Sequence, residues 1–253
     1  FRGVTPAHGI IISALHSPNS ASAMSLVFSP PALTTVPVFG GGSYPVHRIY
    51  CVGRNYADHA VEMGFTGREP PFFFMKPADA VVAVADGETG AIDYPPLTAN
   101  LHHEIELVIA IGTGGSGIKA AHAADHIWGY AVGLDMTRRD LQNDMKKQGR
   151  PWCIGKAFDQ SAPIGAVHAK SSTGELTAGA ITVAVNGTVK QTGDLKDLIW
   201  NVNETIEHLS AAWTLQPGDL IFTGTPAGVA AVVRGDLMEG AIDGLGTLKV
   251  RVR

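Results

Sequence analysis

The chain has 253 residues, a formal net charge of −4 and a pI near 6.2, and 45% of its residues are hydrophobic against 17% charged. This balance is typical of a folded globular protein and excludes an intrinsically disordered chain. The sequence has no basic stripe, so nucleic acid and anionic membranes are not expected as partners, and no apolar run approaches the ~18–20 residues of a membrane span.

The chain contains two cysteines, Cys51 and Cys153. Two isolated cysteines form neither a disulfide framework nor a zinc cluster. We therefore expect both thiols to be free and the protein to lie in a reducing, cytoplasmic environment.

Residues 1–43 are expected to form an N-terminal arm, partly flexible or vector-derived, before a folded domain over residues 44–253. The apolar stretch at residues 9–15 weakly resembles the core of a signal peptide, whereas Met24 opens a more ordinary start. We therefore interpret residues 1–23 as lying upstream of the start or as derived from an expression vector. The proline-rich residues 24–46 are expected to contain one or two short strands.

The predicted secondary structure is mostly β. Apolar runs bounded by Gly and Pro predict strands at residues 49–52, 70–77, 101–111, 128–134, 181–186, 188–191, 220–223 and 247–252. Helices are predicted at residues 54–64, 120–126, 136–148 and 197–212. Asn186-Gly187 is a strong hairpin signal between two strands. Because the helices are spaced irregularly, we predict a single α+β domain, mostly β, and not a regular βαβ sheet.

Three acidic residues are the strongest indication of a functional site. Glu104 and Glu106 lie two apart in a predicted strand, so their side chains share one face. Buried carboxylates held together repel each other unless they share a cation or a proton. With Asp135 they suit a hard divalent ion, Mg²⁺ or Mn²⁺. On spacing alone, a protonated or arginine-paired acid couple remains the alternative.

The short helix at residues 54–64 carries a second candidate pair. His59 and Glu62 are spaced i, i+3, so their side chains lie on one face. A carboxylate beside an imidazole orients it and suits a general base that activates water. Spacing alone favours an ordinary surface pair. Glycines at both ends of the helix are candidate hinges of a lid that closes over a ligand.

Two lysines and one turn are further candidates. Lys156 lies among apolar and small residues, where it is suited to stabilise a developing oxyanion. Snorkelling to the surface is the alternative, and Lys76 before Pro77 has the same ambiguity. In the turn at residues 223–228, the backbone amides around Gly224 and the Thr225 hydroxyl are suited to hold a carboxylate.

Taken together, seven ordered segments resemble the fumarylacetoacetate hydrolase family, in its single-domain bacterial and acylpyruvase-like branch. They occupy residues 50–59, 74–77, 100–107, 133–137, 149–152, 155–159 and 223–226. No single segment is specific, but their number and order are. The resemblance implies a mostly β, roll-like sandwich with a few peripheral helices and a short lid helix, usually assembled as a homodimer.

The resemblance also implies roles for the matched positions. The expected ligands of Mg²⁺ or Mn²⁺, with Ca²⁺ as a substitute in crystals, are Glu104, Glu106 and Asp135. The expected catalytic residues are His59, Glu62 and Lys156. Substrate contacts are expected at Arg54, Lys76, Gln142, Arg150, Gly224 and Thr225.

The implied reaction is hydrolysis of a 2,4-dioxo acid to pyruvate and a second carboxylic acid. Water activated by His59, with Glu62 behind it, attacks the C4 carbonyl, while Lys156 and the metal hold charge on the departing enolate. Residues 68–74 and 149–152 resemble the branch that cleaves fumarylpyruvate at the end of gentisate-type aromatic degradation. Arg150 or Arg54 is expected to meet the distal carboxylate.

Three alternatives stay open at this stage. One is an oxaloacetate decarboxylase or tautomerase, which would use the same metal and lysine but would not need water activated by His59. Another is an isomerase or decarboxylase of hydroxy-heptadienedioates. The third is a ligand-binding relative with a dead site, against which the complete set of site residues argues.

Overall fold

The computed structural model describes residue 3, residues 26–56 and residues 68–253. The chain divides into two compact units, Phe1–Ala32 and Leu33–Arg253. The described residues of the first unit have no regular secondary structure, and every element below belongs to the second unit. The predicted helix at residues 54–64, with His59 and Glu62, lies largely outside the described residues, and the arm boundary at residue 43 stays a prediction.

The larger of the two main sheets has eight strands of mixed direction. Its path runs through β4 (Phe72–Lys76), β3 (Ile49–Gly53), β15 (Leu220–Phe222), β8 (Ile105–Ile111), β9 (Ile127–Leu134), β11 (Ala162–Ile164) and β5 (Val81–Ala83), and β12 (His168–Ala169) pairs with β9. β3 is parallel to β15 and β11 is parallel to β5, while the other neighbours are antiparallel. The mixture of directions agrees with the predicted α+β class.

The second main sheet has five strands. Their order is β14 (Thr188–Asp194), β13 (Ala180–Val185), β17 (Leu237–Ile242), β18 (Gly246–Val252) and β6 (Thr89–Ile92). Asn186 and Gly187 join β13 to β14 with φ angles of 50° and 77°. Two successive left-handed residues are what a two-residue hairpin turn requires, so the predicted hairpin is confirmed.

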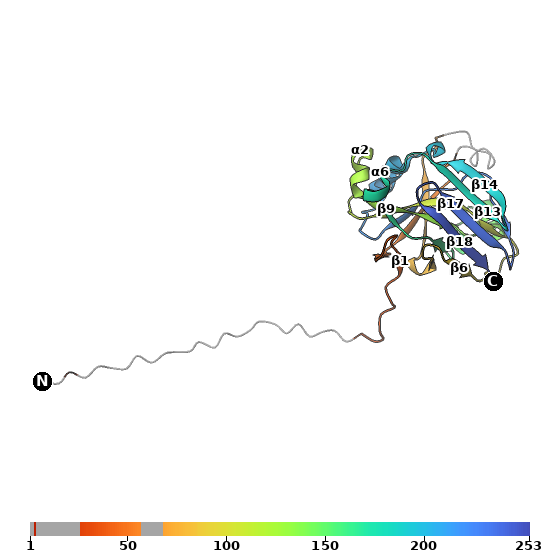
Figure 1. Cartoon of the computed structure of the whole chain (residues 1–253), viewed down its shortest axis with the longest axis horizontal. Helices are drawn as coiled ribbons and strands as arrows, with labels where there is room; N and C mark the ends of the chain where they lie inside the picture. The colour runs from red at the N-terminus through yellow and green to blue at the C-terminus, as the bar shows by residue number, and fades with distance from the viewer. Residues whose placement is uncertain (1–2, 4–25, 57–67) are drawn as a thin grey trace. The chain divides into compact units, whose positions relative to one another are not determined.

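The main hydrophobic core contains residues of both main sheets. Figure 1 shows β13, β14, β17 and β18 of the five-stranded sheet side by side. From β8, the side chains of Ile105, Leu107 and Ile109 enter this core. Val108 and Ala110 enter a second hydrophobic cluster on the opposite face of the sheet. Glu106 is two residues before Val108 in the strand, so its side chain points to the same face as that of Val108. The same alternation that builds the core thus sends Glu106 away from it.

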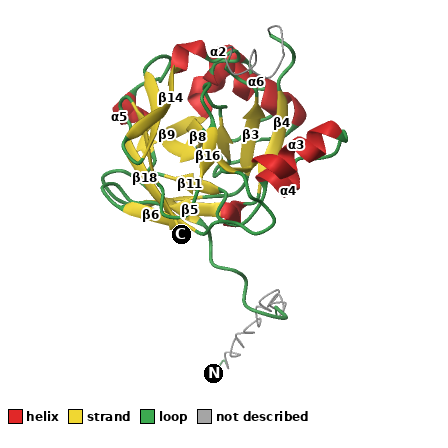
Figure 2. Cartoon of the chain, turned by 90° about the vertical axis from the view of Figure 1, so that its right-hand side faces the viewer, coloured by secondary structure: helices red, strands yellow, loops and turns green. Residues whose placement is uncertain are grey.

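Two small sheets complete the β structure. One contains β10 (Thr137–Arg138), β7 (Leu101–His103) and β16 (Ala230–Val232), and the other contains β1 (Thr35–Pro37) and β2 (Ser43–Pro45). The helices lie around the strands (Figure 2). They are α2 (Ala120–Ala123), α3 (Arg139–Lys147), α4 (Cys153–Lys156), α5 (Lys170–Thr173), α6 (Val202–Ala212) and the 3₁₀ turns η1 (Ala78–Ala80), η2 (Ala124–His126) and η3 (Leu195–Asp197).

The predicted mostly β class is therefore confirmed, with three local corrections. The expected strand at residues 101–111 is broken at Glu104 into β7 and β8, which belong to different sheets. The helix expected from residue 136 begins at Arg139, because Thr137 and Arg138 pair with β7. The helix expected from residue 197 begins at Val202, where Asn201 and Glu204 form a capping box.

The structure bears on the two cysteines and on membrane-spanning helices. Cys51 is buried, Cys153 is exposed, and both are free, as predicted. None of the helices in the described ranges has the length and apolar character that a bilayer crossing requires.

Candidate active site and metal centre

Three buried carboxylates gather where β7, β8 and β9 meet. Glu104 occupies the break between β7 and β8, Glu106 is the second residue of β8, and Asp135 follows the end of β9. The Asp135 N–H donates to the Glu104 carbonyl oxygen at 2.9 Å, which holds the two strand ends together. One carboxylate oxygen from each acid lies within 4.8 Å of the other two. The predicted clustering of these acids is therefore present.

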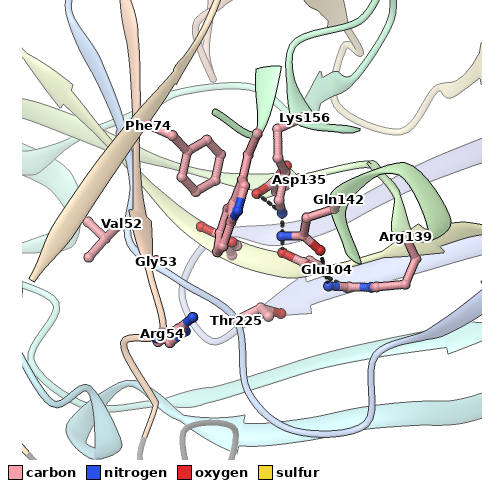
Figure 3. A pocket seen from close by; sticks show the side chains of 12 residues that line it. Val52, Gly53, Arg54, Phe74, Glu104, Asp135, Arg139, Gln142, Lys156 and Thr225 are labelled. Atoms are coloured by element: carbon pink, nitrogen blue, oxygen red, sulfur yellow. Dashed lines mark hydrogen bonds and ion pairs between the residues drawn. The ribbon is translucent and has the colours of Figure 1, made fainter. Parts of the chain in front are cut away.

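Lys156 lies directly against two of the acids (Figure 3). It ends the four-residue helix α4 and is 2% exposed, so the surface alternative does not apply. Its Nζ donates to Glu104 Oε2 at 2.7 Å, to Asp135 Oδ2 at 2.6 Å and to Thr137 Oγ1 at 2.8 Å. Burial lowers the pKa of Lys156, but the charges of Asp135 and Glu104 outweigh burial and raise it. Lys156 is therefore a buried cation.

Lys76 lies behind the carboxylates. It is 1% exposed, and its Nζ lies 2.8 Å from Asp135 Oδ1 and 3.2 Å from the Met136 carbonyl oxygen. Its Nζ also donates to the carbonyl oxygen of Lys156. The contact with Asp135 is an ion pair and not an aligned hydrogen bond, so Asp135 Oδ1 has no hydrogen-bond donor among the described residues. In this geometry Lys76 braces Asp135 and the backbone of Lys156.

Arg139 is a third buried cation at the site, and the sequence reasoning did not select it. It is the first residue of α3 and 8% exposed, and its Nη2 donates to Glu104 Oε1. Its Nη1 donates to Gln142 Oε1 at 2.7 Å, one helical turn away. The sequence contained one signal for Arg139. Gln142 was already predicted to contact the substrate, and a residue three positions earlier in the same helix lies on the same face.

Glu106 provides the test of whether a divalent ion fits. It is 2% exposed and, among the described residues, accepts one hydrogen bond, from the Gly224 N–H at 2.7 Å. Burial, followed by the charges of Asp135 and Glu104, raises the pKa of Glu106 well above its usual value. A bound divalent cation would offset both effects, and oxygen-only ligands suit Mg²⁺ or Mn²⁺. The donor set therefore fits such an ion, held by Glu104, Glu106 and Asp135.

The six predicted substrate residues lie in four places. Lys76 lies behind the acids and lines neither the hollow nor the neighbouring groove. Arg54, Gln142 and Thr225 line the same hollow as the acids (Figure 3). Gly224 adjoins it through its hydrogen bond to Glu106, and Arg150 lines the neighbouring groove. Their contacts with a substrate stay predictions, as do the catalytic roles of His59 and Glu62, which lie outside the described residues.

The hollow at the carboxylates opens beside a wider groove. The hollow measures about 30 Å³, enough for an ion and a water, whereas the groove measures about 610 Å³. Arg54, Phe74 and Trp152 line both spaces. The Arg54 guanidinium lies 5.2 Å from the Phe72 ring centroid and 6.0 Å from that of Trp152. The groove is thus lined by aromatic side chains and by two cations, Arg54 and Arg150.

Comparisons with known proteins agree with this architecture. The family model described as fumarylacetoacetate (FAA) hydrolase C-terminal matches residues 48–253. A crystal structure of fumarylpyruvate hydrolase from Pseudomonas aeruginosa, in complex with Mn²⁺ and pyruvate, is 57% identical with a TM-score of 0.89 and covers 90% of this chain and 99% of that one. The chain belongs to the fumarylacetoacetate hydrolase family.

Two sequence relatives point in different directions within the family. Fumarylpyruvate hydrolase from Ralstonia sp. is 44% identical over 185 residues, which are 73% of this chain and 93% of the relative. A mitochondrial oxaloacetate tautomerase from Rattus norvegicus is 40% identical over 204 residues, which are 81% of this chain and 90% of the relative. The chain is therefore similar to family members that carry the names of two different reactions.

Proposed function

We propose that this chain is a metal-dependent hydrolase that cleaves the C3–C4 bond of fumarylpyruvate, or of a closely similar 2,4-dioxo acid, to fumarate and pyruvate. The observation that carries this proposal is the buried cluster of three carboxylates and three cations beside an aromatic groove. The similarity to the fumarylpyruvate hydrolases of Pseudomonas aeruginosa and Ralstonia sp. supports it.

The charges of the cluster favour an anionic substrate that gains charge during the reaction. The three carboxylates balance the charges of Lys76, Lys156 and Arg139, so this cluster is formally neutral, and Arg54 adds a positive charge at the wall of the hollow. A bound Mg²⁺ or Mn²⁺ would supply Lewis acidity and two surplus positive charges. The enolate of pyruvate, with its carboxylate and its enolate oxygen, carries two negative charges. The site is therefore electrostatically matched to the leaving group of the proposed cleavage.

The protein's own residues would handle the charge and the protons. Water adds to C4 as His59, oriented by Glu62, takes its proton, and the C3–C4 bond then breaks with its electron pair on the pyruvate fragment. Lys156, whose three N–H groups bond to Glu104, Asp135 and Thr137, would stabilise that charge as a buried cation beside the acids. The proton that His59 took from water is then delivered to C3 to complete pyruvate, and the C4 fragment, which has gained the water's oxygen, leaves as fumarate.

The groove accounts for the acyl group. A fumaryl group is flat, unsaturated and terminated by a carboxylate, so it suits the aromatic walls formed by Phe72, Phe74 and Trp152. Arg54 and Arg150, which also line the groove, are the proposed partners of the distal carboxylate.

The decisive experiment measures loss of the enol absorbance of fumarylpyruvate and of acetylpyruvate with Mg²⁺, with and without a chelator. We expect metal-dependent turnover, release of pyruvate and fumarate, and a preference for fumarylpyruvate. Equal or better turnover of acetylpyruvate would reject the acyl assignment while keeping the hydrolase class. Turnover that survives the chelator would reject the metal dependence.

A second candidate function is oxaloacetate tautomerisation or decarboxylation, and the similarity to the tautomerase from Rattus norvegicus favours it. Such chemistry would use the same acids and Lys156 but no activated water. His59→Ala should therefore abolish fumarylpyruvate cleavage and spare any oxaloacetate reaction. Loss of both in a folded variant would mean that His59 does not distinguish them.

Two further alternatives are separated by products and binding. A hydroxy-heptadienedioate isomerase or decarboxylase would give an isomer or CO₂ instead of pyruvate, which mass spectrometry detects. A ligand-binding relative with a dead site would bind Mn²⁺ and oxalate but form no product from any dioxo acid. We further propose a cytoplasmic homodimer, which sedimentation of the purified protein tests.

A further inference from the structure

One buried glutamine connects the metal-site strand to the substrate turn. Gln191 is fully buried, although it belongs to β14, whose other six residues are exposed or half-buried. The pairing of β14 with β13 shifts at this point, because Val183 faces Gln191 while Ala184 faces Val189. Lys190 is thus an extra residue in a β-bulge, and a bulge re-aims the neighbouring side chain. The fold therefore turns Gln191 inward at a specific place.

The amide of Gln191 makes four hydrogen bonds. Its Oε1 accepts from the Ile105 N–H at 3.2 Å and lies 2.8 Å from His103 Nδ1. Its Nε2 donates to Thr225 Oγ1 at 2.8 Å and to the Pro226 carbonyl oxygen at 2.7 Å. Since a backbone N–H only donates and a carbonyl only accepts, the amide orientation is determined by its partners.

These partners flank the functional groups on both sides. His103 and Ile105 are the residues immediately before and after Glu104, so Gln191 Oε1 holds the strand break that presents this carboxylate. On its other side, Gln191 Nε2 holds Thr225 and Pro226, and Thr225 lines the same hollow as the acids (Figure 3).

The hydrogen bond to Thr225 has a directional consequence. Because Thr225 Oγ1 accepts from Gln191, its own hydrogen must point elsewhere. Among the described residues no acceptor for that hydrogen is present, and Thr225 is 3% exposed at the wall of the hollow. The hydroxyl is thereby oriented to donate into the hollow.

We propose that Gln191 is a positioning residue that makes Thr225 a hydrogen-bond donor to the substrate carboxylate and ties Thr225 to the segment that presents Glu104. This inference rests on the proposed function for the identity of the substrate, but not for the binding of a carboxylate. Gln191 itself does not line the hollow and is not proposed to contact the substrate.

The test is a double-mutant cycle of Gln191→Glu and Thr225→Val in the full chain. A glutamate at 191 is isosteric but accepts from Thr225 instead of donating to it, so the Thr225 hydrogen is withdrawn from the hollow. We expect each single variant to raise the KM for fumarylpyruvate with Mg²⁺, and the Kd for oxalate with Mn²⁺, by about 10-fold or more. We expect kcat to change by less than about threefold, as for lost uniform binding.

The double variant should be no weaker than Thr225→Val alone, because both changes remove the same hydrogen bond. Gln148→Glu, at an exposed position, is the charge-matched control and should bind like the parent. Unchanged oxalate binding in a folded Gln191→Glu variant, or losses that add in the double variant, would overturn the proposal. Because oxalate binding needs no turnover, weaker binding in Gln191→Glu supports the positioning role even if the parent does not cleave fumarylpyruvate.

A crystal structure of the unmodified protein with Mn²⁺ and oxalate gives a readout that does not depend on the folding of any variant. The proposal requires Thr225 Oγ1 to lie within about 3.5 Å of both an oxalate oxygen and Gln191 Nε2. A longer distance to either atom would overturn it.

Discussion

Gly224 donates its backbone N–H to Glu106 Oε2 at 2.7 Å, so the turn after β15 is joined to the carboxylate that carries the fewest other contacts. Gly224 has a φ of +97°, and a Cβ at this position would lie 2.7 Å from the Cβ of Asn55. Asn55 is itself fixed, since its amide bonds to the carbonyl oxygens of Trp200 and Thr223, each at 2.8 Å. The turn therefore has no room for a side chain at residue 224.

Gly224→Ala should destabilise the protein more than a glycine replacement that has only backbone strain. Strain at a left-handed position costs about 1–3 kcal/mol, and overpacking against a fixed neighbour adds about 1–3 kcal/mol. Gly244→Ala is the matched control, because Gly244 has a φ of +82° with nothing within 4 Å of its Cβ position. Urea unfolding measures both variants. Equal losses of unfolding free energy would show that the clash with Asn55 is relieved.

Replacement of Glu106 should change metal binding and metal-free stability in different ways. Glu106→Gln removes a ligand, so we expect Mn²⁺ affinity to fall about 10–100-fold or more. Burial raises the pKa of Glu106, which means that its charged form is unfavourable without a cation. The metal-free variant should therefore melt no lower than the metal-free parent.

Thermal unfolding with Mn²⁺ and with a chelator tests this pair of expectations. Glu239→Gln, which removes a surface carboxylate 3.1 Å from Lys249, is the control and should keep the parent's Mn²⁺ response. A full Mn²⁺-induced rise in melting temperature in Glu106→Gln would exclude Glu106 as a ligand.

Lys156→Met should lower kcat without removing metal binding. Lys156 is the buried cation that pairs with both Glu104 and Asp135, and loss of one group that stabilises a developing oxyanion costs about 10²–10³-fold in kcat. Steady-state kinetics at saturating Mg²⁺ measures this loss, with Lys249→Met as the control for a surface lysine. A kcat within threefold of the parent would remove Lys156 from the proposed chemistry.

The sequence indicated Glu104 and Glu106 through a local rule, whereas the resemblance to the family gave most of the support for a metal site that includes Asp135. Alternation along β8 separates Glu106 from the core residues Ile105 and Leu107, and this alternation is visible in the sequence. Arg139 was missed because its partner Glu104 is 35 residues away, and no local pattern specifies that pairing. Gln191 was missed for a related reason, since a bulge and not the regular alternation of β14 turns it inward.

Element boundaries show the same division between local and distant causes. The hairpin at Asn186-Gly187 was predictable because these two adjacent residues alone determine the turn conformation. The start of α3 was not, because Thr137 and Arg138 extend a sheet through pairing with β7, which lies far back in the chain. The same distant pairing places Arg139 at the first position of α3, beside the acids.

Arg139→Met should destabilise the metal-free protein strongly. It would leave the buried carboxylate of Glu104 with one cation fewer, and breaking a buried ion pair costs about 3–5 kcal/mol. Mn²⁺ should recover part of the loss, since it would compensate the same carboxylate. Urea unfolding with and without Mn²⁺ measures both effects, and Arg251→Met, at an exposed position, should cost below about 0.5 kcal/mol. A loss for Arg139→Met as small as that of the control would mean that Glu104 does not depend on Arg139.

The pH dependence of stability should contain a contribution from His168, away from the acids. His168 stacks on Phe39 with ring centroids 4.4 Å apart and an interplanar angle of 14°. Burial lowers the pKa of His168 below the ordinary histidine value of 6.5, and the charge of Asp86 offsets only part of this. The unfolded chain therefore binds a proton at His168 more readily than the folded chain does. Stability must fall as the pH drops through about 6.5 and continue to fall until the folded-state pKa is passed.

His168→Phe keeps an aromatic ring against Phe39 but cannot titrate, so it isolates this contribution. Between pH 8 and pH 5 we expect the melting temperature of the parent to fall further than that of the variant, because only the parent gains a proton at residue 168 on unfolding. Differential scanning calorimetry at several pH values, with the same metal content throughout, measures the difference. Parallel pH profiles would show that the imidazole of His168 has the same proton affinity in the folded and unfolded chains, and a steeper fall in the variant would reverse the sign of the argument.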